Sequence, residues 1–525
     1  MTRYLAIIGF LVVLAVPLAA RSWMGLAAAP APSAGVETIV VVTPDNVDIR
    51  NEFARAFSAW HLKTYGTAVQ IDYRSVGGTN DIRRLLDTFY RAHWDENGKL
   101  PPESEIHPEI DVVFGGGDFM FDQQLKPDPI SGRPGDIKPI PIDPAFLHEV
   151  FPEPTLAGVK LYDTSVDGRG NPTVYWIGAC LSSFGIVFNA DLCQHIGVPV
   201  PRTWSDLADP RFADLLALAD PTHSGSAAAA YMMVLQRAMA DSESEYLSAH
   251  PDLAHGPPGQ WSGDAGYNAA IAAGWKIGMG RLVLIAANAR YFTDSGTVVP
   301  TDVGNGEAAA GIAIDFFGRV ESQTVGPDRA MYVGPIAATA ITPDSVAILY
   351  GVQGRRLELS MHFIEFLLSK PGQLLWDLKA GEPDGPVDRA LRRSPIRRDL
   401  YGDQTGWADP VNPFEQAGGF NTRAAWSAMQ GDTVPFWGAA WIDSRDDLIA
   451  AYDHILAVDD VGRRSELLGR LADLPITLAD FQDYTRSKAK QKTNVDLWLA
   501  GQRIHWAERF AAHYREVGEL AGGKS

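Results

Sequence analysis

The sequence predicts an α/β fold with a parallel sheet and more than one domain, and three observations carry this prediction. With 525 residues the chain is longer than a single hydrophobic core ordinarily serves. Apolar residues make up 46% and charged residues 21%, as in soluble globular proteins. After an N-terminal segment, short β-branched runs alternate with amphipathic helical patterns, which is typical of βαβ units.

The first βαβ units can be placed in order. Glu37–Val42 is a continuous β-branched run, as in a strand covered on both faces, and a helical pattern follows it. We expect next a strand at Val69–Tyr73, a helix at Asp81–Tyr90 and a strand at Asp111–Phe114. Ligands of such sheets bind beyond the carboxyl ends of the strands, where this chain carries glycine-rich turns.

The remainder repeats the α/β pattern and then becomes helical. Tyr175–Asn189 is strand-like, with a break expected at Ser182-Ser183, and a second α/β region follows to about Arg319. Tyr332–Tyr350 is again strand-like. Further helices are expected at Leu357–Trp376, Asp446–Val458, Arg464–Leu474 and Val495–Val517.

The N-terminal segment has the pattern of a secretory signal. A basic start at Arg3 precedes an apolar run from Tyr4 to Ala20 and a linker rich in alanine and proline. The run is shorter than the roughly 20 residues of a comfortable membrane span. Because Pro30 follows the best cleavage site, both a removed signal and a retained anchor stay open.

Charge and cysteine content narrow the function. A net charge of -19 excludes a generally nucleic-acid-binding surface, which must be basic. Cys180 and Cys193 are the two cysteines. In an oxidising compartment they would form one disulfide, and two buried thiols are the alternative.

Five segments follow one another along the chain: Ser183–Leu192, Gly197–Leu207, Asp220–Ser226, Gly306–Ile312 and Ser369–Gln373. In sequence and in order they resemble family 1 extracellular solute-binding proteins, the type II periplasmic binding proteins of ABC importers for ferric iron, thiamine, phosphonates and related solutes. The resemblance covers about residues 37–397, and the remainder has no counterpart in it.

The resemblance implies a two-lobed fold in which the chain crosses twice between lobes, near residues 175–183 and 315–335. Residues 1–36 would be the signal or anchor, residues 37–180 and 332–397 lobe one, and residues 181–331 lobe two. Residues 398–525 would form a helical C-terminal extension packed on lobe one. The lobes of such proteins close on a ligand by hinge motion.

The resemblance also implies a ligand site in the cleft between the lobes. Lobe one would contribute the turns after its strands: Thr43, Asp45, Asn46, Gly77, Gly78, Thr79, Asn80, Gly117 and Asp118. Lobe two would contribute Ser224, Gly225, Ser226, Arg290, Tyr291, Thr293 and Ser295, with Asp315 near the hinge. Glycine allows close approach of the backbone, and helix N-termini with hydroxyls suit an anion. The alternative for several of these residues is ordinary helix capping.

Tyr291 bears on the ligand class. Ferric-binding members of the family present two adjacent tyrosines, whereas here Phe292 follows Tyr291 and cannot coordinate a metal. The resemblance therefore favours a small organic solute, phosphorylated, phosphonate or thiamine-like, over iron. Asp118 and Asp315 would suit a cationic group, or would serve as an N-cap and a hinge hydrogen-bond acceptor.

The function expected is capture of a solute in the periplasm and delivery to an ABC permease and its ATPase. No catalysis, cofactor or metal is expected, the protein would be a monomer, and the membrane would be touched only through an N-terminal anchor. An exported enzyme using Asp118, His223 and Asp315, or a sensory subunit, is the alternative.

Overall fold

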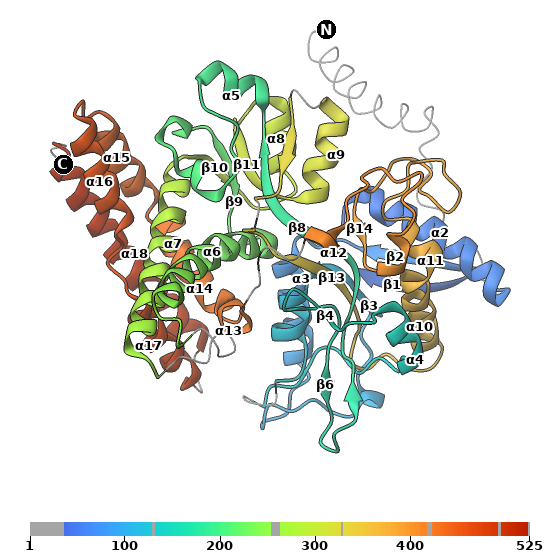
Figure 1. The fold of residues 1–525 in the computed structure, drawn as a ribbon. Helices are drawn as coiled ribbons and strands as arrows, with labels where there is room; N and C mark the ends of the chain where they lie inside the picture. The colour runs from blue at the N-terminus through green and yellow to red at the C-terminus, as the bar shows by residue number, and fades with distance from the viewer. Residues whose placement is uncertain are drawn as a thin grey trace, which may run out of the picture.

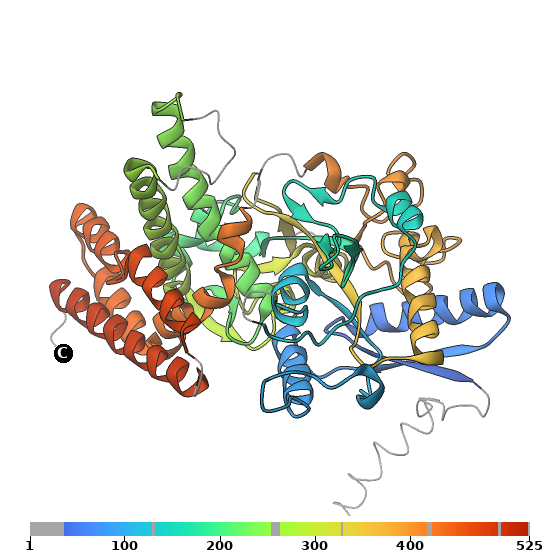
Figure 2. The ribbon, with the colours of Figure 1, turned by 90° about the horizontal axis from the view of Figure 1, so that it is seen from below.

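The computed structural model describes residues 36–128, 132–253, 263–326, 329–335, 337–416, 420, 423–491 and 495–522. Two α/β lobes lie side by side, and a helical extension covers the outer side of the second lobe (Figures 1 and 2). The predicted α/β, two-lobed fold with an additional helical region is confirmed. The segment expected to direct export, residues 1–35, lies outside the described residues.

Lobe one is built on a mixed sheet. Its strands follow the order β2 (Val69–Arg74), β1 (Glu37–Val42), β3 (Val112–Gly117), β13 (Ile341–Ile348) and the first part of β8 (Ile177–Phe188). β1 runs parallel to both β2 and β3, as the βαβ pattern predicts, and β13 is antiparallel to β3 and β8. The carboxyl ends of β1, β2 and β3 therefore meet at one edge.

Helices flank this sheet. α2 (Val47–Tyr65) begins at Asn46, whose side chain accepts from the amide of Ile49, and ends at Gly66 with φ 73°. The helix expected at 357–376 is divided at Ser369, because Pro371 cannot continue the preceding helix. The other helices of this lobe are α3 (Thr79–Arg91), α4 (Pro144–Val150), α10 (Gly354–Leu368), α11 (Lys370–Leu374) and α12 (Pro413–Gln416).

Short elements complete lobe one. They are the hairpins β4 (Thr155–Leu156) with β5 (Val159–Lys160) and β6 (Ser165–Val166) with β7 (Pro172–Thr173), the strand β14 (Ser394–Pro395), and helical turns at Glu103–Glu105, Met120–Leu125 and Arg398–Leu400.

Lobe two has its own sheet, in the order β10 (Ala289–Thr293), β9 (Leu216–Ala219), β11 (Ala310–Ile314) and the second part of β8, with β12 (Met331–Val333) also paired to β8. β9 runs parallel to β10 and β11, and β8 is antiparallel to β11. Its helices are α5 (Ala190–Ile196), α6 (Gly225–Ala249), α7 (Ala265–Ala287), α8 (Val299–Asn305) and α9 (Asp315–Val325), with short turns at Trp204–Ala208 and Pro210–Phe212.

One strand belongs to both lobes. The sequence predicted a break at Ser182-Ser183, which is wrong, because β8 continues through both serines. Its pairing changes there instead: Ser183 lies opposite Ile341 of β13, and Phe184 lies opposite Ile314 of β11. The chain returns to lobe one between Val333 and Ile341.

The C-terminal extension lies on lobe two, so its predicted packing on lobe one is wrong. Phe436, Trp437 and Trp441 share one continuous apolar core with α6 and α7 of lobe two. Phe414 packs against the apolar core of lobe one, and Phe420 is already buried in the core of lobe two. The extension comprises α13 (Ala424–Ser427), α14 (Gln430–Trp437), a π-helical turn at Gly438–Asp443, α15 (Arg445–Leu456), α16 (Val461–Ala472), α17 (Leu478–Ala489) and α18 (Val495–Leu520).

The long helix α7 is the one described helix whose length and composition would suit a membrane span. Trp275, Met279 and Val283 of α7 are buried, and the helix packs against α6, α16 and α17. Coverage by the extension thus accounts for an apolar surface that lobe two alone would leave exposed.

Of the two alternatives left open for the cysteines, the structure shows two buried thiols and no disulfide. Cys180 and Cys193 are free and buried, in the cores of lobe one and lobe two respectively. The stretch of β8 from Cys180 to Phe188 is extended and spans roughly 26 Å, whereas bonded cysteines have Cα atoms within about 7 Å. Burial raises the pKa of Cys180 to about 12 and that of Cys193 to about 11.

Candidate functional site

The strand ends of lobe one are packed tightly around two glycines. Gly115 and Gly116 have φ values of 88° and 97°, which L side chains rarely adopt. A Cβ atom on Gly115 would lie 2.7 Å from Asp45 Oδ2, and one on Gly116 would lie 2.7 Å from Thr79 Cγ2. The structure therefore brings Asp45, after β1, and Thr79, after β2, together at the end of β3.

Three other predicted residues of lobe one have structural partners nearby. Thr43 is fully buried, and its hydroxyl oxygen accepts from the amide of Asp45 at 3.1 Å. Asn46 caps α2, which is the structural alternative considered for it. Gly117 pairs with Asp344 of β13.

The two lobes touch at a small surface that we call the inter-lobe seam: Gly78, Thr79 and Asn80 of lobe one against Thr222, His223 and Gly225 of lobe two. A Cβ atom on Gly225 would lie 2.3 Å from Thr79 Oγ1. Asn80 Nδ2 donates to the carbonyl oxygen of Thr222 at 3.4 Å. The carbonyl of His223 would lie 3.7 Å from a Cβ atom on Gly78.

Two helices begin at the inter-lobe seam. α3 starts at Thr79 and α6 starts at Gly225, so their N-termini approach each other from different lobes. Ser224 caps α6 by accepting from the amide of Ala227 at 3.2 Å, and its hydroxyl lies 3.0 Å from that of Ser226. The first amides of a helix have no intrahelical acceptor, and helix N-termini attract anions.

A further turn of lobe two adjoins these serines. A Cβ atom on Gly296 would lie 3.3 Å from Ser226 Oγ and 3.5 Å from Ser224 Oγ. Within the same turn, the hydroxyl of Thr293 donates to the carbonyl of Ser295 at 2.9 Å. The structure thus places the turn that contains Thr293 and Ser295, both predicted site residues, beside Ser224 and Ser226 at the start of α6.

Tyr291 is engaged inside lobe two. Its hydroxyl donates to Asp302 of α8 at 2.9 Å, and burial together with this hydrogen bond raises the pKa of Tyr291 to about 12. Phe292 lies beneath the guanidinium of Arg445 from the extension, 5.3 Å from the ring centre. Arg290 donates to the carbonyl of Glu307 at 2.6 Å. These contacts hold the segment as part of the fold of lobe two.

Asp315 lies at the hinge. It is 4% exposed, and it accepts from the hydroxyl of Ser183 in β8 at 3.2 Å and from Arg319 at 2.9 Å. These are the contacts of a hinge hydrogen-bond acceptor, one of the two roles the sequence allowed. Its contacts are with Ser183, Arg319 and the amide of Phe316, and neither Asp118 nor His223 is among them.

Arg393 is a central residue that the sequence analysis missed. It is 1% exposed, donates to Asp45 at 3.0 Å and to Ser182 of β8 at 3.1 Å, and pairs with Asp344 of β13. Its guanidinium lies 4.0 Å from the ring centre of Phe316 in α9. Arg393 therefore ties the strand ends of lobe one to the first turn of a lobe-two helix.

The charge on Asp45 is only partly compensated by Arg393. Burial raises the pKa of Asp45, while the nearby Arg393 opposes the rise. Asp45 Oδ2 and Arg393 Nε are both buried without a hydrogen-bond partner among the described residues. Buried polar atoms of this kind are uncommon in proteins and point to a polar partner.

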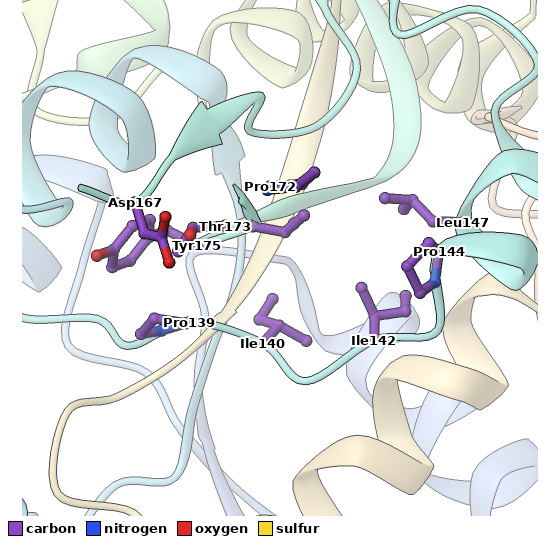
Figure 3. A pocket seen from close by; sticks show the side chains of 10 residues that line it. Pro139, Ile140, Ile142, Pro144, Leu147, Asp167, Pro172, Thr173 and Tyr175 are labelled. Carbon is purple, nitrogen blue, oxygen red and sulfur yellow. The ribbon is translucent and has the colours of Figure 1, made fainter. Parts of the chain in front are cut away.

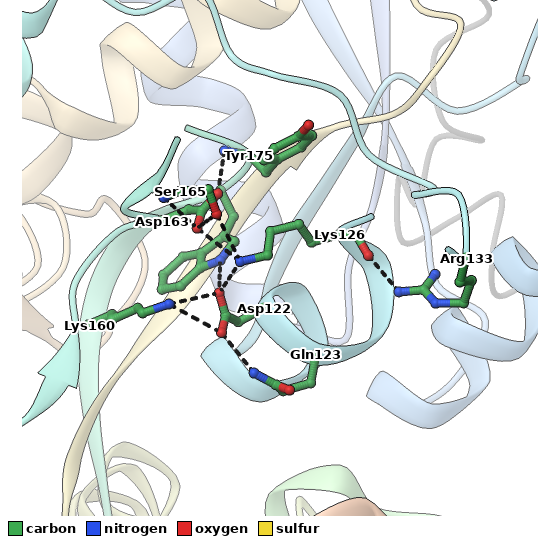
Figure 4. A network of polar contacts seen from close by, with 9 residues as sticks. Asp122, Gln123, Lys126, Arg133, Lys160, Asp163, Ser165 and Tyr175 are labelled. Atoms are coloured by element: carbon green, nitrogen blue, oxygen red, sulfur yellow. Dashed lines mark hydrogen bonds and ion pairs between the residues drawn. The ribbon is translucent and has the colours of Figure 1, made fainter. Parts of the chain in front are cut away.

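Asp118 and Asp122 lie one helical turn apart and ionise differently. Asp122 accepts from Lys126 at 2.7 Å and from Lys160 at 3.3 Å, and Lys126 also donates to Asp163 (Figure 4). Burial alone would raise the pKa of Asp122, but Lys126 and Lys160 hold it below its usual range. Burial raises the pKa of Asp118 to about 7, and the charge of Asp122 contributes to the rise.

A pocket of about 400 Å³ lies elsewhere on lobe one (Figure 3). Apolar side chains such as Ile140, Ile142 and Leu147 form much of its wall, and Asp167 and Thr173 stand at one side. None of the predicted site residues lines it. Within the described ranges, no three His, Cys, Asp or Glu side chains gather as ligands for a metal ion.

Comparisons with known proteins bear on the middle of the chain. Residues 155–261 match the family model of bacterial extracellular solute-binding proteins. The matched stretch includes β8, which passes between the lobes, and α6, which begins at the inter-lobe seam. A comparison with curated proteins finds no match.

Solved structures similar to this chain have low sequence identity. The periplasmic binding protein AfuA from Actinobacillus pleuropneumoniae, with exogenous fructose-6-phosphate bound, is 17% identical with a TM-score of 0.49, covering 78% of this chain and 98% of AfuA. Iron-bound HitA from Pseudomonas aeruginosa is 15% identical with a TM-score of 0.45, and the match covers 76% of this chain and 97% of HitA. The spermidine/putrescine substrate-binding protein PotD from Streptococcus pneumoniae is 14% identical with a TM-score of 0.42, and the match covers 76% of this chain and 98% of PotD.

Proposed function

We propose that this protein is an exported solute-binding component of an ABC importer, which captures a small anionic organic solute at the inter-lobe seam. The observation that carries the proposal is the meeting of two helix N-termini, those of α3 and α6, from different lobes. The match of residues 155–261 to bacterial extracellular solute-binding proteins supports the same class of function.

Electrostatics favours an anion at this position. Each helix N-terminus carries a partial positive charge equivalent to about half an elementary charge. At the start of α3, Asp81 accepts from the amide of Gly78 at 3.1 Å, and at the start of α6, Ser224 accepts from the amide of Ala227. An anion between the two ends would be attracted by both and would accept from the first-turn amides that these caps leave unbound. The hydroxyls of Thr79, Ser224 and Ser226 add neutral donors at the same place.

Asp118 is compatible with an anionic solute for a separate reason. With its pKa raised to about 7, its carboxyl group carries a proton in neutral or mildly acidic surroundings. A protonated carboxyl donates a hydrogen bond, whereas a carboxylate would repel the solute. We therefore include Asp118 with Gly77, Gly78, Asn80 and Gly117 among the residues of lobe one that would contact the solute.

Binding would be coupled to motion about the hinge. The lobes are joined by β8 and by the segment between β12 and β13, both of which carry hydrogen-bonded side chains such as Ser183. A solute drives closure only as far as it binds the closed form more tightly than the open form. Contacts from residues on both sides of the inter-lobe seam would make binding to the closed form tighter than binding to the open form.

The solute class we favour is phosphorylated, phosphonate or thiamine-like. A ferric ligand would call on Tyr291, whose hydroxyl is already engaged with Asp302. An enzyme would call on Asp315, whose carboxylate already binds Ser183 and Arg319. The partners implied are a membrane permease and its ATPase, and the compartment is the periplasm.

A thermal-shift screen tests the proposal. The full chain is heated with inorganic phosphate, sugar phosphates, phosphonates, thiamine phosphate, spermidine and ferric citrate in turn. A solute present at 100 times its dissociation constant stabilises the folded state by about 2.7 kcal/mol, which raises the melting temperature by several degrees. An anionic compound should give this rise, and the Gly225→Ala variant should lose it. A rise only with spermidine or ferric citrate, or turnover of any compound, would contradict the proposal.

A further inference from the structure

Helix α14 of the C-terminal extension has a glycine at each end, one beside lobe one and one beside lobe two. Gly431, in its first turn, and Gly438, just beyond its end, are seven residues apart. That spacing is about two helical turns, or roughly 10 Å, and places both glycines on one face. Each glycine lies beside a residue that is next to the candidate site, Phe119 for Gly431 and Thr222 for Gly438.

Gly431 meets lobe one. A Cβ atom on Gly431 would lie 3.3 Å from Phe119 Cζ and 3.8 Å from Phe119 Cε1. Phe119 directly follows Asp118 at the end of β3, and the adjoining Met120 and Phe121 are buried in the core of lobe one. The ring of Phe119 therefore crosses the gap and rests against the extension.

Gly438 lies against Thr222, a residue on the lobe-two side of the inter-lobe seam. A Cβ atom on Gly438 would lie 2.8 Å from Thr222 Cγ2, and the carbonyl of the same threonine accepts from Asn80 of lobe one. Arg503 of α18 also lies close to Gly438, and it holds the turn through two hydrogen bonds to Asp443 at 2.6 and 2.8 Å. A side chain at position 438 would displace Thr222.

The extension is fixed rigidly to lobe two. Gln236 of α6 donates to Ser427 at 3.1 Å, and Arg423 pairs with Glu243 of α6 at 2.7 Å. Phe436 and Trp437 of α14 are fully buried in the core of lobe two. α14 must therefore move with lobe two, so its contact with Phe119 exists only while the two lobes are together.

We infer that the extension is a third surface of the closing device: docking of Phe119 on Gly431 stabilises the closed arrangement before any solute binds. The inference rests on the proposed function, because it assumes that the lobes open and close. It assigns to Phe119 and Gly431 the role of positioning residues, which set the population of the closed state without touching the solute.

The consequence for affinity follows from population arithmetic. If only the closed-competent state binds, the apparent dissociation constant rises in proportion as that state becomes rarer. A substitution that makes the closed state about ten times rarer therefore weakens binding about tenfold, without altering a single solute contact. Adding bulk at Gly431 is the most direct way to do this.

Distance measurements between two spin labels test the inference without a solute. Thr64 in α2 and Gln194 in α5 are exposed and lie in different lobes, so cysteines placed there report on the separation of the lobes. The native Cys180 and Cys193 are buried and do not compete for the label. The variants compared are Gly431→Leu, Phe119→Ala and, as a matched control, Gly469→Leu, since Gly469 lies on α16 with open space around it.

We expect Gly431→Leu and Phe119→Ala to shift the distance distribution to longer or broader values, and Gly469→Leu to leave it unchanged. Circular dichroism identifies any variant that has lost its fold. If Gly431→Leu has lost its fold, Phe119→Ala alone provides the test. A distribution that stays the same in both folded variants overturns the inference. If the variants change the distance but no compound of the screen changes it in the parent protein, the inference stands and the proposed solute is wrong.

Discussion

Thr79 of lobe one lies so close to Gly225 of lobe two that a methyl group at Gly225 would be 2.3 Å from Thr79 Oγ1. The same methyl group would be 3.5 Å from Thr79 Cβ, which is an ordinary contact distance. One oxygen atom therefore decides whether a side chain at position 225 is compatible with the closed lobes.

This geometry makes a reciprocal pair of substitutions informative. Gly225→Ala should force the lobes apart and lengthen the distance between labels at positions 64 and 194. Thr79→Ala removes Oγ1, so the double variant should return to the parent distance. If the double variant stays as open as Gly225→Ala, the overlap with Thr79 is not what opens the lobes, and our account of the seam is wrong.

Asp118 should make solute binding depend on pH. Its folded pKa of about 7 means that it keeps its proton and can donate a hydrogen bond below that pH, and carries a negative charge above it. We expect the affinity for an anionic solute to fall above pH 7, by at most about tenfold per pH unit for one proton. Calorimetric titration of the solute found by the screen, between pH 6 and 9, measures this. Asp118→Asn should bind with an affinity that no longer changes over that range.

Asp377 should lower stability as the pH rises. It is 2% exposed, and burial, with the charge of Asp409, raises its pKa to about 9. The folded protein thus keeps a proton that the unfolded chain loses above about pH 4, so the free energy of unfolding falls between pH 4 and 9. Asp377→Asn keeps the oxygen that accepts from the amide of Asp409. By urea unfolding, it should be more stable than the parent by about 1–3 kcal/mol at pH 8 and equal at pH 4.

Cys180 and Cys193 should remain reduced. Thiol titration of the protein unfolded without reductant should find both thiols, and titration of the folded protein should be slow, because burial raises both pKa values above 10. The melting temperature should be the same with and without a reductant. A lower melting temperature in reductant would indicate a disulfide.

Trp437 should be as important for lobe two as residues of its own sheet. It is fully buried, 5.9 Å from Tyr231 of α6 between ring centres, and its indole N–H lies 3.4 Å from Met279 Sδ in α7. Trp437→Ala should reduce the free energy of unfolding by about 3–5 kcal/mol. Leu497→Ala is the control, because Leu497 is 74% exposed in α18. Equal, small effects would mean that the extension is only loosely attached.

Much of the fold could be predicted because its signals are local. The β-branched run Glu37–Val42 and the amphipathic helix around Leu86 depend only on neighbouring residues, and both appear as expected. Three of the tail helices, α15, α16 and α18, were also predicted within a few residues, whereas α14 and α17 were not. Which lobe these helices cover was not predictable, because an apolar helix face does not specify the surface that it covers.

The residues of the candidate site could be predicted where glycine and hydroxyl residues directly follow strands. They were missed where a contact joins residues that are far apart in the sequence. Arg393 pairs with Asp45 across 348 positions of the chain, from a segment without a helical or strand pattern. Ser182-Ser183 predicts a break in the strand, yet each serine makes a hydrogen bond where the pairing of β8 changes, Ser182 with Arg393 and Ser183 with Asp315. Tyr291 was placed by resemblance alone, and its contact with Asp302 could not be foreseen.

The strand β8 has a consequence for how the protein is made. Lobe one needs β13 and Arg393 to complete the sheet begun by β1, and lobe two needs Tyr514 of the extension to complete its core. Lobe one therefore cannot finish folding before Arg393 has been synthesised, nor lobe two before Tyr514, and long-range pairing of this kind is intrinsically slow.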